Sequence, residues 1–457
     1  MIHEIAKELE RIVGERWLSK DPRAIEPYLY DRTQSAVRPK ASENVIVVKP
    51  GSIEEVARVV SAAHEASIPI YPRGGGTGLT GGAVPTKPGI IISLERLNRI
   101  IIEKENMVAD VEAGATLGSL ISEAEKNGLF FPPHPGDEGA QIGGLIACNA
   151  GGSRAVRHGT MRNFVLGLQV VLPNGEIATI GGKTPKNNMA TNFYHLFIGS
   201  EGTLGIIVRA WIRLYPKPKN SATILVPYRN AYDAIDSAMK LLWEGYVPLS
   251  LELVDSDSLR KTAEYLRIEW RYGNGDFYLM LVLVEPTIEM LYTELEGIAK
   301  ILEEKASGEP ILAERDDEQK EILKIRSEVY SAYENEMFEG LDVSVPLGEL
   351  TRFVRFIEDL EKKYNVRIPL LAHLGDGTFH PDLLYSGLDE ASLERMRDEI
   401  YDAVISMGGS ITGEHGIGYT RRRYAEKYLN DNLKKLIKKV KSAIDDKGIM
   451  NPEKYIP

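Results

Sequence analysis

The sequence predicts an α+β fold made of two different parts. Glycine-rich loops gather in the first part of the chain, and from residue 216 onward the pattern changes to alternating strands and helices. In this second part the order strand-helix-strand-strand-helix-strand, which is typical of ferredoxin-like units, occurs twice. We therefore expect one domain over residues 1–215, a second over residues 216–420, and a helical segment over residues 421–457 that returns to the first domain.

Composition limits the classes of function. The chain has 457 residues, of which 43% are hydrophobic and 26% charged, as is ordinary for a globular protein of two or three domains. Its net charge of -11 argues against a nucleic-acid partner, because binding to phosphate backbones needs clustered lysines and arginines. The single cysteine, Cys148, excludes an internal disulfide and an iron–sulfur cluster held by this chain alone.

The N-terminal residues indicate where the protein works. "MIHEIAKELERIVGERWLSK" has the pattern of a charged amphipathic helix and not that of a signal peptide. The chain contains no run of about 18 apolar residues, the length that a transmembrane helix needs. We expect a cytoplasmic protein without a transmembrane segment, which meets a membrane only through a partner.

The first glycine-rich loop, "RGGGTGLTGG" at Arg73–Gly82, follows a short predicted strand. Three of its glycines match the G-x-G-x-x-G pattern of dinucleotide-binding sites. A Rossmann site also needs a helix directly after the loop, and Pro85 and Pro88 break that stretch. The Walker A pattern fails as well, because no Gly-Lys-Ser or Gly-Lys-Thr ends the loop. We reject both interpretations.

Consecutive glycines still allow the loop to bind an anion. Glycine adopts positive φ at no steric cost, so that successive N–H groups can point at one phosphate. Arg73 at the edge of the loop is expected to add a cationic contact. The alternative is a hairpin tip without a ligand, but a plain turn needs one or two glycines, and each further one costs ~0.5–1 kcal/mol. A phosphate-containing ligand is the better hypothesis.

A second glycine-rich region covers residues 136–205, and "PNGE" within it predicts a hairpin between two apolar strands. The polar segment "YPKPKN" at 215–220 indicates a domain boundary. Beyond it, one helix is expected around 317–336 and a last one around 422–447.

Histidines and acidic residues form a second constellation. In "AHLGDGTFHP" a Gly-Asp-Gly turn separates His373 from His380, and a hairpin there would bring both imidazoles to one side. The glycine-flanked "TGEHGIG" carries Glu414 and His415. Two histidines and one carboxylate make a metal site with open positions. The alternative, a pair of hydrogen-bonded strand histidines beside an unrelated glutamate, stays open from the pattern alone.

Taken in order, these motifs resemble a known family. "PRGGGTGLTGGAVP", "IGGLIACNAGGSRAVRHGTMRNFV" and "GSEGTLGII" closely resemble the FAD-binding domain of the vanillyl-alcohol oxidase and p-cresol methylhydroxylase (PCMH) superfamily. More narrowly, the chain is similar to the D-lactate dehydrogenase, glycolate oxidase and D-2-hydroxyglutarate dehydrogenase branch, from "RPKASENV" to "GIMNPEKY". The resemblance implies a PCMH-type FAD-binding domain followed by an FAD-linked oxidase C-terminal domain, which caps the substrate.

The resemblance also implies which residues hold the cofactor. The first loop would wrap the FAD pyrophosphate, the second region would line the flavin and a third segment would complete the cleft. Relatives with covalent flavin often have a histidine in the first loop, where this chain has glycines, so we expect non-covalent FAD. Cys148 is expected to be a packed residue, and His134 and His158 are equally compatible with flavin contact and with structural roles. The implied cofactor residues are Arg73, Gly74, Gly75, Gly76, Thr77, Gly78, Pro135, Gly136, Gly143, Gly144, Asn149, Gly152, Gly202 and Gly205.

Further matches concern metal and substrate. The resemblance implies that His373, His380 and Glu414 bind a divalent metal, often zinc, and that His415 is the catalytic base. Arg326 matches a helix arginine that clamps the substrate carboxylate through its bidentate fork. The resemblance thus raises the metal hypothesis above its alternative. From the sequence itself, Tyr330, one turn further along the predicted helix, is placed to hydrogen-bond the substrate, and Asp376 is expected to be a turn residue.

The chemistry explains this set of residues. Oxidation of a 2-hydroxy acid removes a hydroxyl proton and a hydride from one carbon; a Lewis acid and a histidine assist the first, and a flavin accepts the second. The leading expectation is FAD- and metal-dependent oxidation of a D-2-hydroxy acid to the 2-oxo acid. D-2-hydroxyglutarate enzymes carry a lysine shortly before a D-[LV]-S-[LV]-P strand, where this chain has Glu339 and Gly340 in "MFEGLDVSVP". This departure favours a monocarboxylate such as D-lactate or glycolate.

Other functions remain as alternatives. One is a non-redox flavin enzyme of the alkylglycerone phosphate synthase type, and another is D-2-hydroxyglutarate dehydrogenase itself. A metallohydrolase with purely structural glycine loops, and a flavin subunit inactive without partner chains, are the others. In the redox cases electrons leave through a quinone, an electron-transfer flavoprotein or a partner subunit. A homodimer is compatible with the sequence.

Overall fold

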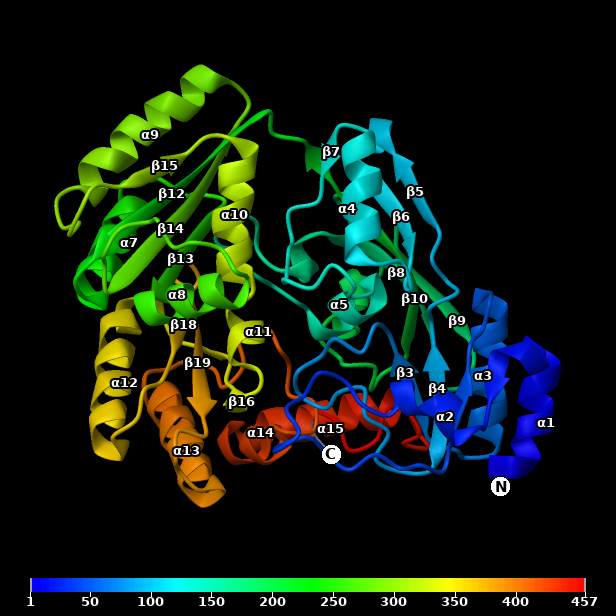
Figure 1. Cartoon of the computed structure of the whole chain (residues 1–457). Helices are drawn as coiled ribbons and strands as arrows, with labels where there is room; N and C mark the ends of the chain where they lie inside the picture. The colour runs from blue at the N-terminus through cyan, green and yellow to red at the C-terminus, as the bar shows by residue number, and fades with distance from the viewer. Residues whose placement is uncertain (1, 456–457) are drawn as a thin grey trace. The chain divides into compact units, whose positions relative to one another are not determined.

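The computed structural model describes residues 2–455, which divide into two compact units (Figure 1). Within these residues, unit 1 covers 2–150, 160–217 and 414–455, and unit 2 covers 151–159 and 218–413.

Unit 1 begins with a small sheet ordered β1-β2-β4-β3, in which β2 and β3 run parallel to β4. The apolar runs "VIVV" and "GIIIS" are buried along their whole length, as parallel strands usually are. Helix α3 follows the cap residue Ser52, whose hydroxyl accepts from the Glu55 N–H, and the Glu55 carboxylate accepts from the N–H of Gly51. The elements of this layer are α1 (Ile2–Val13), β1 (Leu18–Ser19), α2 (Pro22–Ile25), β2 (Val45–Val48), α3 (Ile53–Glu65), β3 (Ile70–Arg73) and β4 (Gly89–Ser93).

A second sheet of unit 1 is antiparallel, with the order β5-β6-β10-β8-β9. The predicted "PNGE" hairpin joins β8 to β9, with Gly175 at a φ of 88°. Helices α4 and α5 contribute to the core beside this sheet, and β7 pairs with β11. The bounds are β5 (Ile100–Glu103), β6 (Val108–Glu112), α4 (Leu117–Lys126), β7 (Leu129–Phe130), α5 (Ile142–Cys148), β8 (Val165–Val171), β9 (Ile177–Gly181), β10 (Ile206–Arg213) and β11 (Tyr215–Pro216).

The C-terminal residues rejoin unit 1. The single helix expected around 422–447 is wrong: α14 (Arg422–Tyr428) and α15 (Asp431–Ile444) are separate, because Leu429 is extended and Asn430 caps a new helix. The chain then returns to β3 through a bridge between Met450 and Ile70.

Unit 2 is built on one eight-stranded sheet, ordered β15-β12-β14-β13-β18-β19-β16, with β17 paired to β19. The order β15-β12-β14-β13 is that of a ferredoxin-like unit, and β18, β19 and β17 repeat it. The two ferredoxin-like repeats of unit 2 share the sheet through β13 and β18, as the sequence predicts. The expected last strand of the second repeat is only a bridge between Ser344 and Ser410. The bounds are β12 (Asn220–Tyr228), β13 (Ser250–Asp255), β14 (Phe277–Glu285), β15 (Ile311–Ala313), β16 (Met337–Gly340), β17 (Val343–Ser344), β18 (Leu370–His373) and β19 (Thr378–Leu384).

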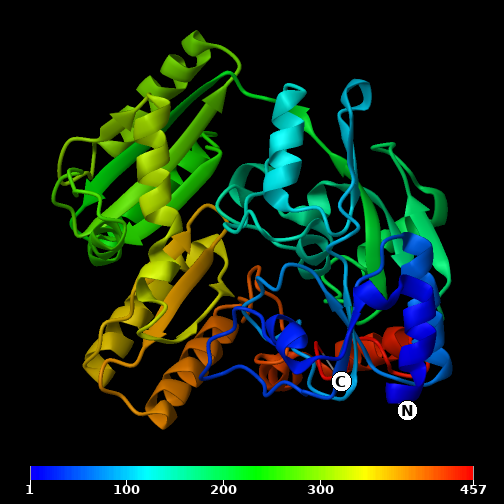
Figure 2. The same cartoon turned by 45° about the vertical axis from the view of Figure 1, so that its right-hand side comes forward.

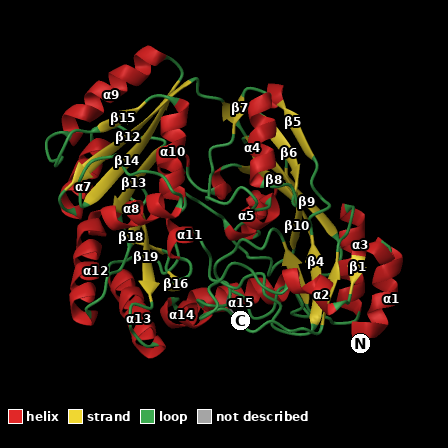
Figure 3. Ribbon diagram, in the orientation of Figure 1, coloured by secondary structure: helices red, strands yellow, loops and turns green. Residues whose placement is uncertain are grey.

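Helices cover both faces of this sheet (Figures 2 and 3). One face carries α7 (Ala231–Trp243), α9 (Ile288–Leu302), α12 (Leu350–Tyr364) and α13 (Glu390–Ser406). The other carries α8 (Ser256–Tyr265), α10 (Asp316–Ser327) and α11 (Val329–Tyr333), whereas α6 (Ala155–His158) contacts β13. The single helix expected around 317–336 is wrong, because Glu328, at φ -94° and ψ 10°, separates α10 from α11.

Asp382, on β19, is a buried carboxylate within this sheet. Burial, together with the charge of Asp255, raises the pKa of Asp382 to about 8. The folded protein therefore keeps this proton up to that pH, whereas the unfolded chain releases it near pH ~4. The stability contributed by the neutral form is full at low pH and is lost as the pH rises through the folded pKa.

We expect Asp382→Asn to weaken this pH dependence, because the amide stays neutral at every pH. Between pH 5 and pH 8.5 (about the range between the two pKa values) the melting temperature of the wild type should fall relative to that of the variant. Thermal unfolding at both pH values measures this, with the exposed Asp359→Asn as control. Equal pH slopes in all three proteins would contradict the assignment.

Candidate functional site

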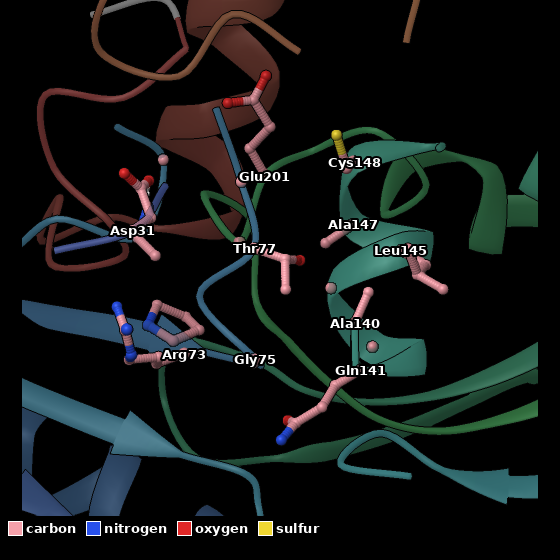
Figure 4. A pocket seen from close by; sticks show the side chains of 18 of the residues that line it. Asp31, Arg73, Gly75, Thr77, Ala140, Gln141, Leu145, Ala147, Cys148 and Glu201 are labelled. Atoms are coloured by element: carbon pink, nitrogen blue, oxygen red, sulfur yellow. Dashed lines mark hydrogen bonds between the residues drawn. The ribbon is translucent and has the colours of Figure 1, made fainter. Parts of the chain in front are cut away.

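A cavity of about 250 Å³ lies within unit 1, between the glycine loop after β3 and helix α5 (Figure 4). Figure 4 shows Gly75 and Thr77 on the loop and Ala147 and Cys148 on α5, with Gln141 just before that helix. Most of the predicted cofactor residues line this cavity: Arg73, Gly74, Gly75, Gly76, Thr77, Gly78, Pro135, Gly143, Gly144, Gly202 and Gly205. Gly136 and Asn149 are not among the lining residues, and Gly152 belongs to unit 2.

The loop has the geometry that the sequence predicts. No helix follows β3 directly, and the next element is β4, so this is not a Rossmann turn. Gly76 has a φ of 71°, which favours glycine. A Cβ on Gly75 would lie 2.9 Å from the carbonyl oxygen of Gly139, so no other residue fits there without a backbone shift. Gly144 differs, because a Cβ on it would meet nothing within 4 Å.

Arg73 lies beneath the loop. Its Nη2 donates to the carbonyl oxygens of Pro27 at 3.0 Å and Tyr30 at 2.8 Å, so that the guanidinium connects the loop to the N-terminal segment. Burial lowers the pKa of Arg73, although Asp31 and Tyr28 oppose that shift. Arg73 is therefore a buried residue that stabilises the loop, and it also lines the cavity.

Three buried polar atoms of the cavity-lining residues have no hydrogen-bond partner among the described residues: Arg73 Nη1, Gln141 Oε1 and Asn451 Oδ1. Buried polar atoms are usually paired, so such a group is typical of a ligand site. The amide-rich glycine loop fits a pyrophosphate, and a donor together with two acceptors fits the polar edges of FAD. The residues of this cavity fit the cofactor.

Asn451 and Glu201 are lining residues that the sequence does not predict. Asn451 Nδ2 donates to the carbonyl oxygens of Gly82, at 3.0 Å, and of Glu201, at 2.7 Å. The Glu201 carboxylate accepts from the N–H groups of Ile417 and Gly418, both at 2.7 Å. Burial raises the pKa of Glu201 in spite of these two bonds. In the sequence, Glu201 stands out only as a polar residue in the glycine-rich "GSEGTLG", and Asn451 only as a polar residue before a proline in "GIMNPEK". These two segments are far apart in the chain.

Glu414 and His415 line the same cavity. Their backbone is fixed from two sides: Cys148 Sγ lies 3.2 Å and 3.3 Å from their carbonyl oxygens, and Thr80 Oγ1 donates to His415 O at 3.4 Å. Cys148 thus packs against this segment, in agreement with the expectation of a packed residue.

In unit 2, His373 and His380 lie on the hairpin formed by β18 and β19, with ring centroids 5.1 Å apart. A ring nitrogen of one lies within 4.8 Å of a ring nitrogen of the other. The predicted hairpin is therefore correct, and it places both imidazoles on one side of the sheet. Asp376 accepts from Thr378 N at 3.2 Å within the turn, as expected of a turn residue.

Glu252, on β13, is one residue beside the histidines of unit 2 that the sequence does not predict. It lies opposite His373 in the sheet register, and it is fully buried. His373 Nδ1 lies 2.9 Å from both of its carboxylate oxygens, and Arg326 forms an ion pair with it. Burial opposes ionisation, but Arg326 and His373 outweigh it and lower the pKa of Glu252. The signal is a lone carboxylate inside the apolar "VPLSLELV".

Arg326 lies in the last turn of α10 with a side chain only 14% exposed, so it is not a solvent-facing arginine. Tyr330 lies on α11. The prediction that Arg326 and Tyr330 share one helix is wrong, because the helix is interrupted at Glu328. Asp342, which we did not predict, has an oxygen within 4.8 Å of a His380 nitrogen. It accepts from Thr412 Oγ1 at 2.8 Å.

The remaining predicted candidates have structural contacts. Asn149 caps α5 at a φ of 57°, and its Oδ1 accepts from Thr160 Oγ1 and Arg162 N, both at 3.0 Å. His134 pairs with Glu138 at 3.3 Å. Burial and the nearby Arg157 and Arg154 lower the pKa of His158 to about 4, so its imidazole is neutral near pH 7.

Comparison with known proteins decides the family. Residues 45–181 match the family described as "FAD binding domain", and residues 217–455 match "FAD linked oxidases, C-terminal domain". The chain belongs to the FAD-linked oxidases. The expected α+β fold with a PCMH-type FAD-binding domain is confirmed, as is the binding of FAD.

Relatives of this FAD-linked oxidase match nearly its whole length. A D-lactate dehydrogenase of Archaeoglobus fulgidus is 36% identical over 430 residues, 94% of this chain and 95% of the relative. Glycolate oxidase subunit GlcD of Bacillus subtilis is 33% identical over 435 residues, 93% and 91% of the two chains. The solved 4-ethylphenol oxidase of Gulosibacter chungangensis shares the fold, with a TM-score of 0.79 at 19% identity over 99% of this chain and 96% of that one.

The solved alkyldihydroxyacetonephosphate synthase shares the fold as well, with a TM-score of 0.76 at 17% identity over 99% and 86% of the two chains. Among residues 2–455, no helix combines the length and the apolar character needed to cross a bilayer.

We expect Gly144→Ala to reduce the amount of FAD that copurifies with the oxidase. The added methyl group meets no protein atom within 4 Å and enters the cavity, so it should obstruct the cofactor and not the fold. The flavin-to-protein absorbance ratio measures the effect, and the melting temperature of cofactor-free protein tests folding. The control is Gly182→Ala, where a Cβ also meets nothing within 4 Å but which is not among the cavity-lining residues. Equal flavin content in both variants would contradict this placement of FAD.

Proposed function

We propose that this enzyme, an FAD-dependent hydroxyacid dehydrogenase, oxidises a D-2-hydroxy acid of the D-lactate or glycolate type to the 2-oxo acid with the assistance of a divalent metal, for which zinc is our proposal. Support comes from relatives named D-lactate dehydrogenase and glycolate oxidase over nearly the whole chain. The observation that carries the proposal is the imidazole pair of His373 and His380, held on one hairpin beside the buried carboxylates of Glu252 and Asp342.

His373, His380 and Glu414 are the proposed metal ligands. Histidine nitrogen is a common zinc ligand, and two histidines with one carboxylate make up the three protein ligands of many catalytic zinc sites. Glu414 directly follows Gly413, and a Cβ on Gly413 would touch Thr378 and Asp342 of unit 2. When bound, the cation supplies a Lewis acid for the substrate hydroxyl, and non-covalent FAD accepts the hydride.

The protein residues have distinct roles in this proposal. His415 accepts the hydroxyl proton, since an imidazole is a suitable base near neutral pH and its backbone is fixed in the cavity wall. Arg326 binds the substrate carboxylate, because a guanidinium fork matches a carboxylate in geometry and charge. Tyr330 donates a hydrogen bond to the substrate from the adjacent α11.

A substrate with one carboxylate fits the chain better than hydroxyglutarate. Glu339, near the position where hydroxyglutarate enzymes are expected to carry a lysine, is buried and paired with Arg397 at 2.6 Å. Arg397 also pairs with Glu394 at 2.9 Å, so its guanidinium is already shared by two carboxylates. This segment therefore offers no cation for a second substrate carboxylate.

The electrons leave through an external acceptor in this proposal, whether a quinone, an electron-transfer flavoprotein or a partner subunit. One cysteine is too few for an iron–sulfur cluster within the chain.

Anaerobic addition of D-lactate or glycolate should bleach the flavin absorbance near ~450 nm, because the substrate transfers its hydride to the bound cofactor. L-lactate, the other enantiomer, and NADH should not bleach it. In His415→Ala the bleaching rate should fall by roughly 10²–10⁴-fold, the usual contribution of a general base. Its FAD content should equal that of the wild type. A flavin that no 2-hydroxy acid reduces would refute the dehydrogenase and favour a non-redox flavin enzyme.

Removal of the metal should abolish turnover without loss of flavin. Dialysis against a chelator leaves the loop that binds the pyrophosphate unchanged, so the absorbance spectrum should persist while reduction by D-lactate stops. Restoring Zn²⁺ should recover the rate. Full activity of metal-free protein, verified by elemental analysis, would disprove the role of the metal.

A further inference from the structure

Glu252 connects two residues that have separate proposed tasks. His373 is a proposed metal ligand, and Arg326 is the proposed carboxylate clamp. Both contact the same carboxylate: His373 Nδ1 lies 2.9 Å from each oxygen, and Arg326 Nη2 pairs with Oε2. We propose that Glu252 is a positioning residue that orients the metal-binding imidazole and the substrate-binding guanidinium together.

The first part of the argument concerns the tautomer of His373. An ionised carboxylate accepts hydrogen bonds and donates none, so the Nδ1 atom of His373, 2.9 Å from both Glu252 oxygens, carries the proton; Arg326 Nη2, 3.1 Å from the same atom, then contacts the ring without donating to it. Nε2 is then the nitrogen through which His373 binds a cation. Metal-binding histidines commonly donate their other ring N–H to a carboxylate in this way, which fixes the ring and makes it a stronger ligand.

The second part concerns charge. Glu252 is completely buried, and its only charged partner among the described residues is Arg326, apart from the imidazole of His373. A buried carboxylate without a cation is strongly disfavoured, so Glu252 and Arg326 hold each other in place. The same contact keeps Arg326 at the end of α10, next to the hairpin that bears the histidines.

The third part concerns rigidity. Glu252 lies in the interior of β13, directly opposite His373 of β18, at the junction where the two ferredoxin-like units share their sheet. A side chain on a central strand has a fixed direction, whereas one on a loop does not. The junction therefore places a single acceptor between two functional residues that come from different segments of the chain.

The inference rests on the proposed function, and the experiment separates the two. Zn²⁺ affinity is measured by competition with a chromogenic chelator in the FAD-containing wild type, in Glu252→Gln and in Glu252→Asp. We expect Glu252→Gln to weaken Zn²⁺ binding 10–100-fold, the usual effect of losing such a carboxylate. The KM for D-lactate should also rise, because Arg326 loses its anchor. FAD content should not change, since every residue that lines the flavin cavity belongs to unit 1.

The matched control is Glu285→Gln. Glu285 is also a buried carboxylate of this sheet, on β14, and it pairs with Arg157 at 3.4 Å, away from both histidines. Its loss should lower thermal stability and leave Zn²⁺ affinity unchanged. The shorter Glu252→Asp keeps the charge and should retain part of the Zn²⁺ affinity.

Each outcome has one meaning. Wild-type protein that binds no Zn²⁺ would overturn the metal proposal and this inference with it. If the wild type binds Zn²⁺ and Glu252→Gln binds it equally well, the inference alone is wrong. If both glutamine variants weaken binding to the same extent, the effect is a general loss of stability and the inference is also wrong. Should Glu252→Gln fail to fold, as judged by circular dichroism and thermal unfolding, the same comparison between Glu252→Asp and the wild type decides.

Discussion

Close approach of backbone to backbone around the flavin cavity is the constraint on which unit 1 depends. The loop after β3 passes so near the Gly139 carbonyl that Gly75 has no room for a side chain. Arg73 supports this loop from below through two carbonyl oxygens. A Rossmann fold binds phosphate at a helix terminus, whereas in the site we propose for this chain the phosphate would meet loop amides held in place by a buried cation.

Two carboxyl groups that accept several hydrogen bonds also hold parts of the candidate sites in place. Glu201 in unit 1 accepts two backbone N–H groups of the segment that follows His415, and Glu252 in unit 2 accepts from a histidine and an arginine. In both places a carboxyl group shielded from water needs several hydrogen-bond donors, and these donors come from distant parts of the sequence. Each carboxyl group thereby fixes the positions of the residues that donate to it.

Local patterns account for what the sequence predicts well. The prolines after the glycine loop exclude a helix, and the Gly-Asp-Gly turn is sufficient to bring His373 and His380 together. The predictions fail where long-range contacts decide. Glu252 meets His373 only because β13 pairs with β18 across two repeats, and no local pattern encodes that register. The breaks at Glu328 and Leu429 were missed because the helical periodicity continues on both sides of each residue.

The cavity walls come from segments on both sides of unit 2 in the sequence, and this has a consequence for biogenesis. Asp31 precedes residues 218–413, whereas Glu414, His415 and Asn451 follow them and are synthesised later. A nascent chain can fold the ferredoxin-like repeats of unit 2 before these wall residues have been synthesised. The wall of the cavity is therefore completed only after unit 2 has been synthesised.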